Sequence, residues 1–310
     1  MHPALSVIVF TTLSGLGYGL WMWSGLALAL GRGPHGGIAH HTALVLGVLP
    51  VLVGLLSSTL HLGKPLRAWR AFGQWRTSWL SREGVLALLT FLPWLALTWA
   101  WIPGNGDFST WFPWLPLLLA LMSLATVVST AMIYASLKPV PAWRQPGVVP
   151  VYVGFALLTG GLAASAWQAV GAWPGDVVVL GLMLLALVLG IGKRRYWRRL
   201  DRGEMPVDRA SALGLPADRV ATVFERPHTE ASYLTREMGF VLARKHSRHL
   251  RVIALALFAV VPAGICALCL VLPVPAGPLL AVAATSALLG AMVERWLFFA
   301  EAKHLVMLYY

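Results

Sequence analysis

Eight apolar runs, each close to the length of a membrane-spanning helix, divide this 310-residue sequence. A bilayer core of about 30 Å requires roughly 20 apolar residues in helical form. The runs are Ala4–Leu30, Thr42–Leu60, Gly84–Trp101, Trp114–Leu137, Val148–Gly171, Asp176–Gly192, Val252–Leu272 and Pro278–Leu305. They predict an all-α, polytopic integral membrane protein with about eight transmembrane helices, forming a single membrane domain over residues 1–310.

Composition excludes an ordinary soluble domain. Only 12% of the residues are charged and 58% are hydrophobic, and the mean hydropathy is +0.73. Soluble domains carry roughly twice that share of charge. The net charge of +12 is compatible with nucleic-acid binding, but in a membrane protein it more often reports basic cytoplasmic loops. We therefore expect no nucleic-acid partner.

The basic residues are concentrated in alternate connections. Those after the second, fourth and sixth runs, together with the C-terminal end, hold 22 of the 24 Lys and Arg, and the exceptions are Arg32 and Arg295. Because Lys and Arg accumulate in cytoplasmic loops, we expect both termini in the cytoplasm and the protein in the bacterial inner membrane. The connection 61–83 is weaker evidence for this orientation if its charges serve a site or a partner.

That connection is itself unusual for a membrane loop. The stretch from His61 to Gly84 holds five basic residues, three Trp, His61 and a single acid, Glu83. His61 follows the second run and Glu83 opens the third. Because the two runs are neighbours in sequence, we expect both side chains to line one cavity at the cytoplasmic face.

A quinone head group is a flat ring with two carbonyl oxygens, so its site requires hydrogen-bond donors and a group that passes protons. A histidine titrates near pH 6.5, and the pKa of a carboxyl group can be raised toward neutrality. His61 and Glu83 therefore suit a quinone site, with Arg82 beside Glu83 and Trp79 among its apolar walls, and they suit an ordinary membrane interface equally well. For the Trp and most of the Arg residues, an aromatic belt with extended Arg side chains is the better explanation.

The first run contains a polar face formed by Thr11, Ser14 and Tyr18, and Gly15 and Gly19 form a small-xxx-small pair. Close packing of another helix is the main explanation for this pattern. Ser14 and Tyr18 are also candidates for hydrogen bonds to a ligand, because a buried hydroxyl is costly when unsatisfied.

Ionisable residues inside a membrane are costly and therefore suggest a function. In the eighth run Glu294, Glu301 and His304 are spaced to share one helical face, and Arg295 follows Glu294. Two interpretations stay open. One is a proton relay toward the cytoplasm, and the simpler one is a structural Glu294–Arg295 pair with further residues that reach the interface.

No metal or haem site is expected in this chain. Cys266 and Cys269 lie deep in an apolar run with no further ligands nearby, and two small apolar side chains explain them. Haem requires strong axial ligands, usually His, and His61 and His304 form no facing pair within the spans. The sequence contains no phosphate-binding loop, dinucleotide-binding fingerprint or zinc-protease motif.

The longest connection, residues 193–250, opens with KRRYWRRLDR, a stretch that suits contact with anionic lipid. Its middle is long for a structureless loop and favours docking of a soluble partner. Leu234, Met238, Val241 and Leu242 recur at helical spacing, which predicts an amphipathic helix on the membrane surface.

Three stretches resemble one protein family: MHPALSVIVFTTLSGLGYGLW, SSTLHLGKPLRAWRAFGQWRTSWLSREGV and RPHTEASYLTREMGF. They look like the membrane-anchor subunit of the dimethyl-sulfoxide reductase family of molybdoenzymes, and the resemblance runs along the whole chain. It implies an anchor without haem or metal that binds a molybdopterin catalytic subunit and an iron–sulfur subunit and exchanges electrons with quinone, either ubiquinone or menaquinone. It also implies that His61 and Glu83 are the quinone-site His and Glu.

The charge pattern and the RPHTEASYLTREMGF stretch favour the sulfite-oxidising branch of that family, whose partner subunits are cytoplasmic. The expected function is electron transfer from sulfite oxidation, through the iron–sulfur partner, to membrane quinone. The residues expected to face the partner are Lys64, Arg67, Arg70 and Arg236. The alternatives are the anchor of a dimethyl-sulfoxide reductase that oxidises menaquinol, a secondary transporter, a purely structural anchor and a haem-bearing cytochrome subunit.

Overall fold

The computed structural model describes residues 3–31, 36–60, 64–102, 112–202, 208–216, 218–225 and 242–308. In this part of the chain every regular element is a helix, and eight helical spans are long and apolar enough to cross a membrane. They are α1 (Leu5–Ala29), α2 (Gly36–Thr59), α3 (Trp79–Ala100), α5 (Leu115–Ala135), α6 (Val148–Gln168), α7 (Asp176–Asp201), the composite of α10 (Leu242–Leu255), η2 (Ala256–Val260) and α11 (Val261–Val271), and α12 (Ala276–Ala300). The predicted all-α architecture is confirmed.

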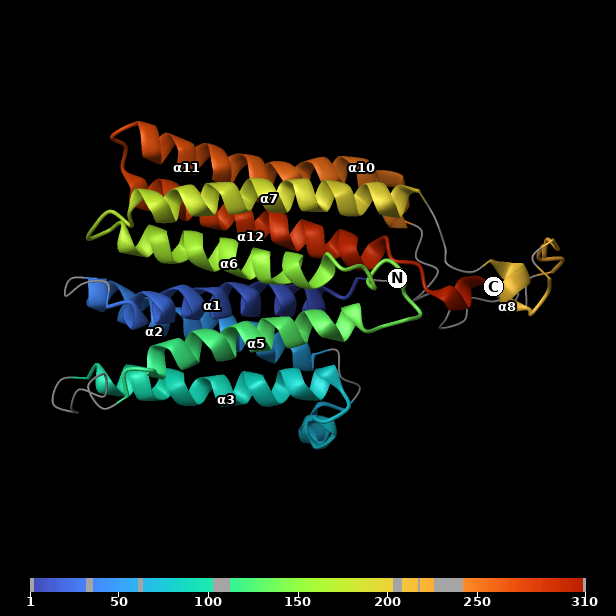
Figure 1. The fold of residues 1–310 in the computed structure, drawn as a ribbon, viewed down its shortest axis with the longest axis horizontal. Helices are drawn as coiled ribbons and strands as arrows, with labels where there is room; N and C mark the ends of the chain where they lie inside the picture. The colour runs from blue at the N-terminus through green and yellow to red at the C-terminus, as the bar shows by residue number, and fades with distance from the viewer. Residues whose placement is uncertain are drawn as a thin grey trace.

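The spans form an elongated bundle with two groups of helices (Figure 1). In one group α1 packs against α2 and α5, and α3 packs against α5. In the other group α12 packs against α6, α10 and α11, and α7 packs against α11. The two groups meet where α1 contacts α6 and α12, so α1 lies at the seam of the bundle.

The two shortest predicted runs are full spans. The third begins at Trp79 rather than Gly84, because Ser78 serves as N-cap and its hydroxyl accepts from the Ser81 N–H at 3.5 Å. The sixth continues to Asp201 rather than ending at Gly192. Its basic end is rich in Arg, a good helix former, and its buried face extends through Lys193, Tyr196 and Trp197.

The seventh span contains a π-helical turn, η2, directly before Pro262. A proline inside a helix has no N–H to donate to the preceding turn. In this region the Leu257 carbonyl accepts from the Ser286 hydroxyl of α12 at 2.7 Å. The bulge therefore accommodates Pro262 while a neighbouring helix satisfies one of the backbone acceptors.

The predicted amphipathic surface helix lies only partly within the described residues. Leu242 begins α10, which continues into the seventh span rather than lying apart from it. Leu234, Met238 and Val241 lie outside the described residues.

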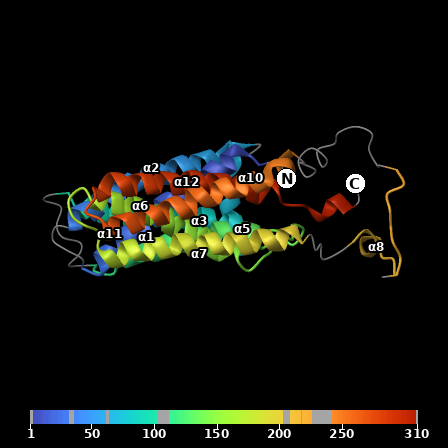
Figure 2. The ribbon, with the colours of Figure 1, turned by 90° about the horizontal axis from the view of Figure 1, so that it is seen from above.

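Both chain ends and the basic connections are found at one end of the bundle (Figure 1). This end carries η1 (Pro65–Gln74), the short helix α8 (Arg209–Ala212) and η3 (Leu305–Leu308). A view from above agrees, with α8 and the C-terminal end beyond the same end of the helices (Figure 2). We call it the basic end.

Close packing between α1 and α6 depends on glycine. A Cβ at Gly19 would overlap the Ala156 carbonyl, and a Cβ at Gly160 would overlap the backbone of Gly19 and Leu20. At Gly15 a Cβ would make only an ordinary contact, 3.9 Å from the Ala156 Cβ. The expected close approach of a neighbouring helix is confirmed, and Gly19 rather than Gly15 makes it possible.

Replacing Gly160 tests this packing. Gly160→Ala places a methyl group inside the backbone of α1, so the two helices must separate. We expect a loss of about 1–3 kcal/mol, measured as a lower apparent unfolding temperature of the purified protein in detergent.

Gly181→Ala is the matched control, because a Cβ at this position in α7 meets nothing within 4 Å. Alanine is the better helix former by about 1 kcal/mol, so this variant should unfold at the wild-type temperature or above it. Equal unfolding temperatures for the two variants would contradict the close approach of α1 and α6.

Candidate functional site

Glu83 is the central residue of the candidate site. It lies near the start of α3, held there by the Ser78 cap, and its side chain is buried, with 6% exposure. Its Oε1 accepts a hydrogen bond from the Thr130 hydroxyl of α5 at 3.4 Å. Because α3 packs mainly on α5 and touches α2 little, the buried neighbour of Glu83 belongs to α5, the fourth span, rather than to α2.

Hydroxyl groups continue from Glu83 along the α3–α5 interface. The single Thr130 hydroxyl proton is shared between Glu83 and the Thr126 carbonyl, which lies 3.1 Å away, and the Thr126 and Thr90 hydroxyls lie 3.3 Å apart. Sequence reasoning missed Thr130. The spacing of Ser123, Thr126 and Thr130 on one buried face of α5 was the available signal.

Tyr18 and Ser14, predicted as ligand-binding residues, are both buried in α1. The Tyr18 ring lies edge-on to Trp21 at 5.6 Å, and its hydroxyl has no hydrogen-bond partner among the described residues. Tyr18 is also within electrostatic range of Glu83. The Ser14 hydroxyl donates to the Phe10 carbonyl at 2.6 Å, which leaves its lone pairs as acceptors.

Arg82 and Trp79 face the η1 connection. Arg82 Nε donates to the Trp75 carbonyl at 3.0 Å, Nη2 donates to the Arg76 carbonyl at 2.6 Å, and the guanidinium lies 4.3 Å from the Trp79 ring. No hydrogen bond or ion pair joins Arg82 to Glu83 within the described residues. Arg82 therefore fastens the connection onto α3, rather than pairing with its neighbour.

Two contacts hold the helix η1 against α3. The Ser81 hydroxyl donates to the Ala71 carbonyl, and Phe72 lies against Gly84, where a Cβ would come within 2.8 Å of its ring. The opposite side of η1 is exposed, with Leu66 93% and Trp69 66% accessible.

Of the residues expected to dock a partner, Lys64, Arg67 and Arg70 lie on or beside this exposed helix, and the Arg70 guanidinium lies 5.5 Å from the Trp69 ring. Arg236 lies outside the described residues, and so does His61, in the chain between α2 and η1.

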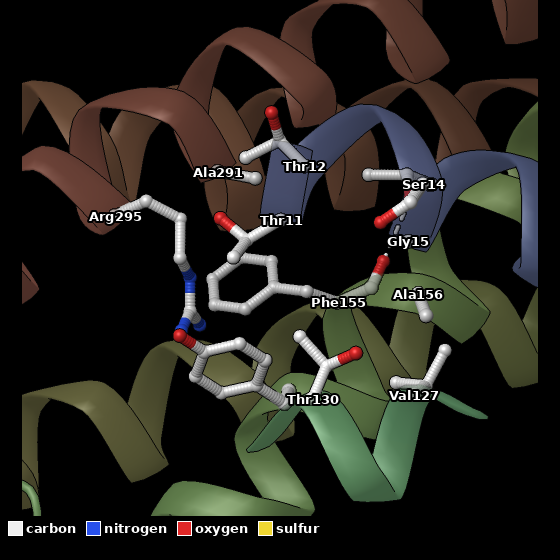
Figure 3. A pocket seen from close by; sticks show the side chains of 12 residues that line it. Thr11, Thr12, Ser14, Gly15, Val127, Thr130, Phe155, Ala156, Ala291 and Arg295 are labelled. Carbon is white, nitrogen blue, oxygen red and sulfur yellow. Dashed lines mark hydrogen bonds between the residues drawn. The ribbon is translucent and has the colours of Figure 1, made fainter. Parts of the chain in front are cut away.

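A small cavity lined by several polar side chains lies at the seam of the two helix groups. Its walls come from α1, α5, α6 and α12, and Figure 3 shows Thr11, Thr130 and Arg295 around the same space. Ser14 and Thr159 also line it. Thr130 thus faces this cavity and also contacts Glu83.

A buried ionic network begins at Arg295. Glu294 Oε1 lies 2.5 Å from Lys193 Nζ of α7, and its Oε2 lies 2.8 Å from Arg295 Nε. The Lys193 ammonium is 3.8 Å from the Tyr196 ring, and the Arg295 guanidinium is 3.7 Å from the Tyr152 ring. The predicted structural pair is therefore a triad. We define the ionic network as this triad together with a second one formed by Asp201, Arg251 and Glu301, and no ion pair joins the two triads within the described residues.

The outer part of the network reaches the basic end. Arg251 of α10 lies 2.9 Å from Glu301 and 2.8 Å from Asp201, whose side chain is 60% exposed. Sequence reasoning placed Lys193 in a surface loop. The sequence signal that could have placed Lys193 inside the bundle is its spacing, because Leu182, Leu189 and Lys193 lie on one buried face of α7.

His304 does not share the helical face expected of it, because α12 ends at Ala300. Its Nδ1 accepts from the Val306 N–H at 3.0 Å, and burial lowers its pKa. Burial also raises the pKa of Glu301, against the opposing effect of Arg251. Glu301 belongs to the ionic network, whereas no hydrogen bond or ion pair joins His304 to that network within the described residues.

Comparison with known proteins agrees with these features. Residues 1–300 match the family described as DMSO reductase anchor subunit (DmsC). The chain is 32% identical to a sulfite dehydrogenase subunit from Allochromatium vinosum over 338 aligned residues, which cover 100% of this chain and 99% of that relative. With eight apolar spans, the chain is a multi-pass membrane anchor from a multi-subunit complex, and it belongs to the DMSO reductase anchor subunit family.

Proposed function

We propose that this chain is the quinone-reactive anchor of a sulfite-oxidising molybdenum enzyme in the bacterial inner membrane. The full-length similarity to a sulfite dehydrogenase subunit supports the choice of branch. The observation that carries the quinone role is Glu83, a carboxyl group buried in a membrane span near the basic end, within electrostatic range of the unpartnered Tyr18 hydroxyl.

The residues present fit a quinone. A carbonyl oxygen accepts hydrogen bonds, and the Tyr18 hydroxyl and the His61 imidazole are donors. Bound quinone supplies an acceptor for two electrons and two protons. In this proposal His61 donates a hydrogen bond to the head group, Glu83 delivers protons, and Thr130 orients the Glu83 carboxyl group.

The overall reaction balances. Oxidation of sulfite to sulfate with one water molecule releases two electrons and two protons, and conversion of quinone to quinol consumes the same numbers. A molybdopterin subunit carries out the first half, and an iron–sulfur subunit delivers the electrons to the membrane. If protons are released and taken up on the same side, turnover does not itself charge the membrane.

The exposed side of η1 is the proposed docking surface for the iron–sulfur subunit. It combines the cations Lys64, Arg67 and Arg70 with the exposed Trp69, and aromatic and Arg side chains are enriched in protein interfaces. Because η1 is fastened to α3 close to Glu83, a partner bound there lies near the proposed quinone site.

One alternative has direct support. The family description names DMSO reductase, so a complex that oxidises menaquinol and reduces a sulfoxide is the second candidate. The same residues would serve in the opposite direction, with Glu83 accepting protons from quinol.

Removing the proposed acid–base groups tests the quinone site. Glu83→Gln keeps the size of the side chain but not its titration, and His61→Ala removes the imidazole. Because acid–base catalysis is typically worth a factor of about 10²–10⁴, we expect quinone-coupled sulfite oxidation to fall at least 100-fold in either variant. A soluble artificial electron acceptor should still be reduced at the wild-type rate.

The controls are Glu225→Gln and His249→Ala, two exposed positions that should leave both activities unchanged. Normal quinone reduction by a fully assembled Glu83→Gln or His61→Ala complex would refute the site.

Charge reversal tests the docking surface. The triple variant Lys64→Glu, Arg67→Glu, Arg70→Glu should lose the iron–sulfur subunit during purification, and more readily at high ionic strength, which screens the remaining attraction. The double variant Arg198→Glu, Arg199→Glu changes exposed cations on α7 at the same end and should keep its partner. Loss of the partner in both variants would argue against docking on η1.

Cysteine labelling tests the orientation, since both native cysteines are buried in α11. Leu213→Cys lies at the basic end and Val170→Cys lies in the connection between α6 and α7. With the basic end in the cytoplasm, a membrane-impermeant maleimide should label Val170→Cys in spheroplasts and Leu213→Cys only after the membrane is opened. The reverse pattern would overturn the orientation.

A further inference from the structure

Three buried donors near the seam cavity have no well-aligned acceptor, although the Arg295 guanidinium and the Tyr152 hydroxyl interact with each other. Arg295 Nη1, Arg295 Nη2 and the Tyr152 hydroxyl find no well-aligned hydrogen-bond partner among the described residues. Both side chains line the cavity, and Arg295 is 3% exposed. Burying donors without partners is costly, so groups of this kind indicate that an acceptor occupies the space beside them.

The cavity also presents acceptors. The Thr11 hydroxyl donates to the Val7 carbonyl at 2.9 Å, Ser14 to Phe10 and Thr159 to Phe155 at 2.8 Å. Each of these oxygens has used its proton inside its own helix, and its lone pairs remain to accept from a molecule in the cavity.

The size of the cavity favours water as that molecule. The centres of water molecules have about 20 Å³ available, which is room for about one or two waters. This is less than a quinone ring with its two carbonyl oxygens requires. Water both accepts and donates, so it matches the donors of Arg295 and Tyr152 on one side and the hydroxyl oxygens on the other.

The cavity connects two charged regions. Thr130 lines the cavity and donates to Glu83, and Arg295 lines it and binds Glu294 through Nε. Lys193 pairs with Glu294 in the inner triad, and Arg251 links Glu301 to the exposed Asp201 in the outer triad. Glu294 and Glu301 are separated by about 10 Å of helix axis at 1.5 Å per residue.

The charges of the network compensate one another. Lys193, Arg251 and Arg295 are three cations, and Asp201, Glu294 and Glu301 are three anions. A neutral network places no net charge barrier in front of a proton moving inward, and its carboxylates are groups that can carry one.

We propose that water in the seam cavity and the carboxylates of the ionic network form a proton route from the basic end to Glu83. The quinone-linked role of the route rests on the proposed function. A proton enters at the exposed Asp201, passes along Glu301 and Lys193 to Glu294, and reaches the Glu83 carboxyl group beside Thr130 through the cavity water. Each transfer breaks one bond to hydrogen and forms another, so no oxidant or reductant is required. The route enters from the α7–α12 side, away from η1, and stays open when a partner covers η1.

Hydrogen–deuterium exchange at Glu83 tests the route without turnover. In membranes moved from H₂O to D₂O, the Glu83 carboxyl band is the infrared band that Glu83→Gln lacks. The double variant Thr11→Val, Thr159→Val removes two cavity hydroxyls that do not touch Glu83. Exchange should slow about tenfold or more, because each of the two neutral hydrogen bonds lost raises a barrier by up to roughly the amount that changes a rate tenfold.

Thr285→Val is the matched control, since Thr285 makes the same bond to its own helix, to the Ala281 carbonyl at 2.9 Å, but is exposed on α12. Its exchange should remain at the wild-type rate. Wild-type exchange in the cavity double variant would overturn the proposal.

Glu301→Gln is a second, independent variant at the outer end of the route, and it should also slow exchange at Glu83. If the cavity double variant is not recovered from membranes, wild-type exchange in Glu301→Gln overturns the proposal by itself. The quinone site fails separately, through normal quinone reduction by Glu83→Gln, and exchange measured without quinone is unaffected by that outcome.

Discussion

Buried charge in an apolar bundle is the constraint on which the rest of this structure depends. Neither lipid tails nor packed apolar side chains compensate an ammonium or a carboxylate, so such groups must find partners within the bundle. Lys193 and Arg295 converge on Glu294, and Arg251 joins Glu301 to Asp201. Removing one partner of such a set would leave an uncompensated buried charge, which is far costlier than the intact network.

The ionic network and the candidate site lie in different groups of helices. The ionic network ties α7, α10 and α12 together, whereas the group formed by α1, α2, α3 and α5 holds Glu83 and the hydroxyls beside it. The seam cavity lies between them, lined from both groups. Glycine at positions 19 and 160 lets α1 and α6 approach closely along this seam, so the polar elements of both groups come within reach of one cavity.

Part of the candidate site was predictable from sequence. Glu83 followed from the rarity of an acid at the start of an apolar run and from the family motif, and its side chain is buried. Tyr18 and Ser14 followed from the polar face of α1. Arg82 has a different place from the one expected, because the carbonyls of Trp75 and Arg76 lie closer to its guanidinium than the carboxyl group does. Thr130 and Lys193 were missed, because each lies in a segment whose composition suggests only a span or a basic loop.

The sequence by itself determined the number of spans, the basic end and the membership of a family, since hydropathy, charge and motif are properties read along the chain. Tertiary structure decided which buried groups face each other. Glu83 meets α5 rather than α2, and Lys193 becomes part of the interior. The physical reason is that helix pairing depends on small residues and on complementary polar groups distant in sequence. Helix length also decides which ionisable residues lie on the helices of the bundle, because α7 continues past its apolar run and α12 stops before His304.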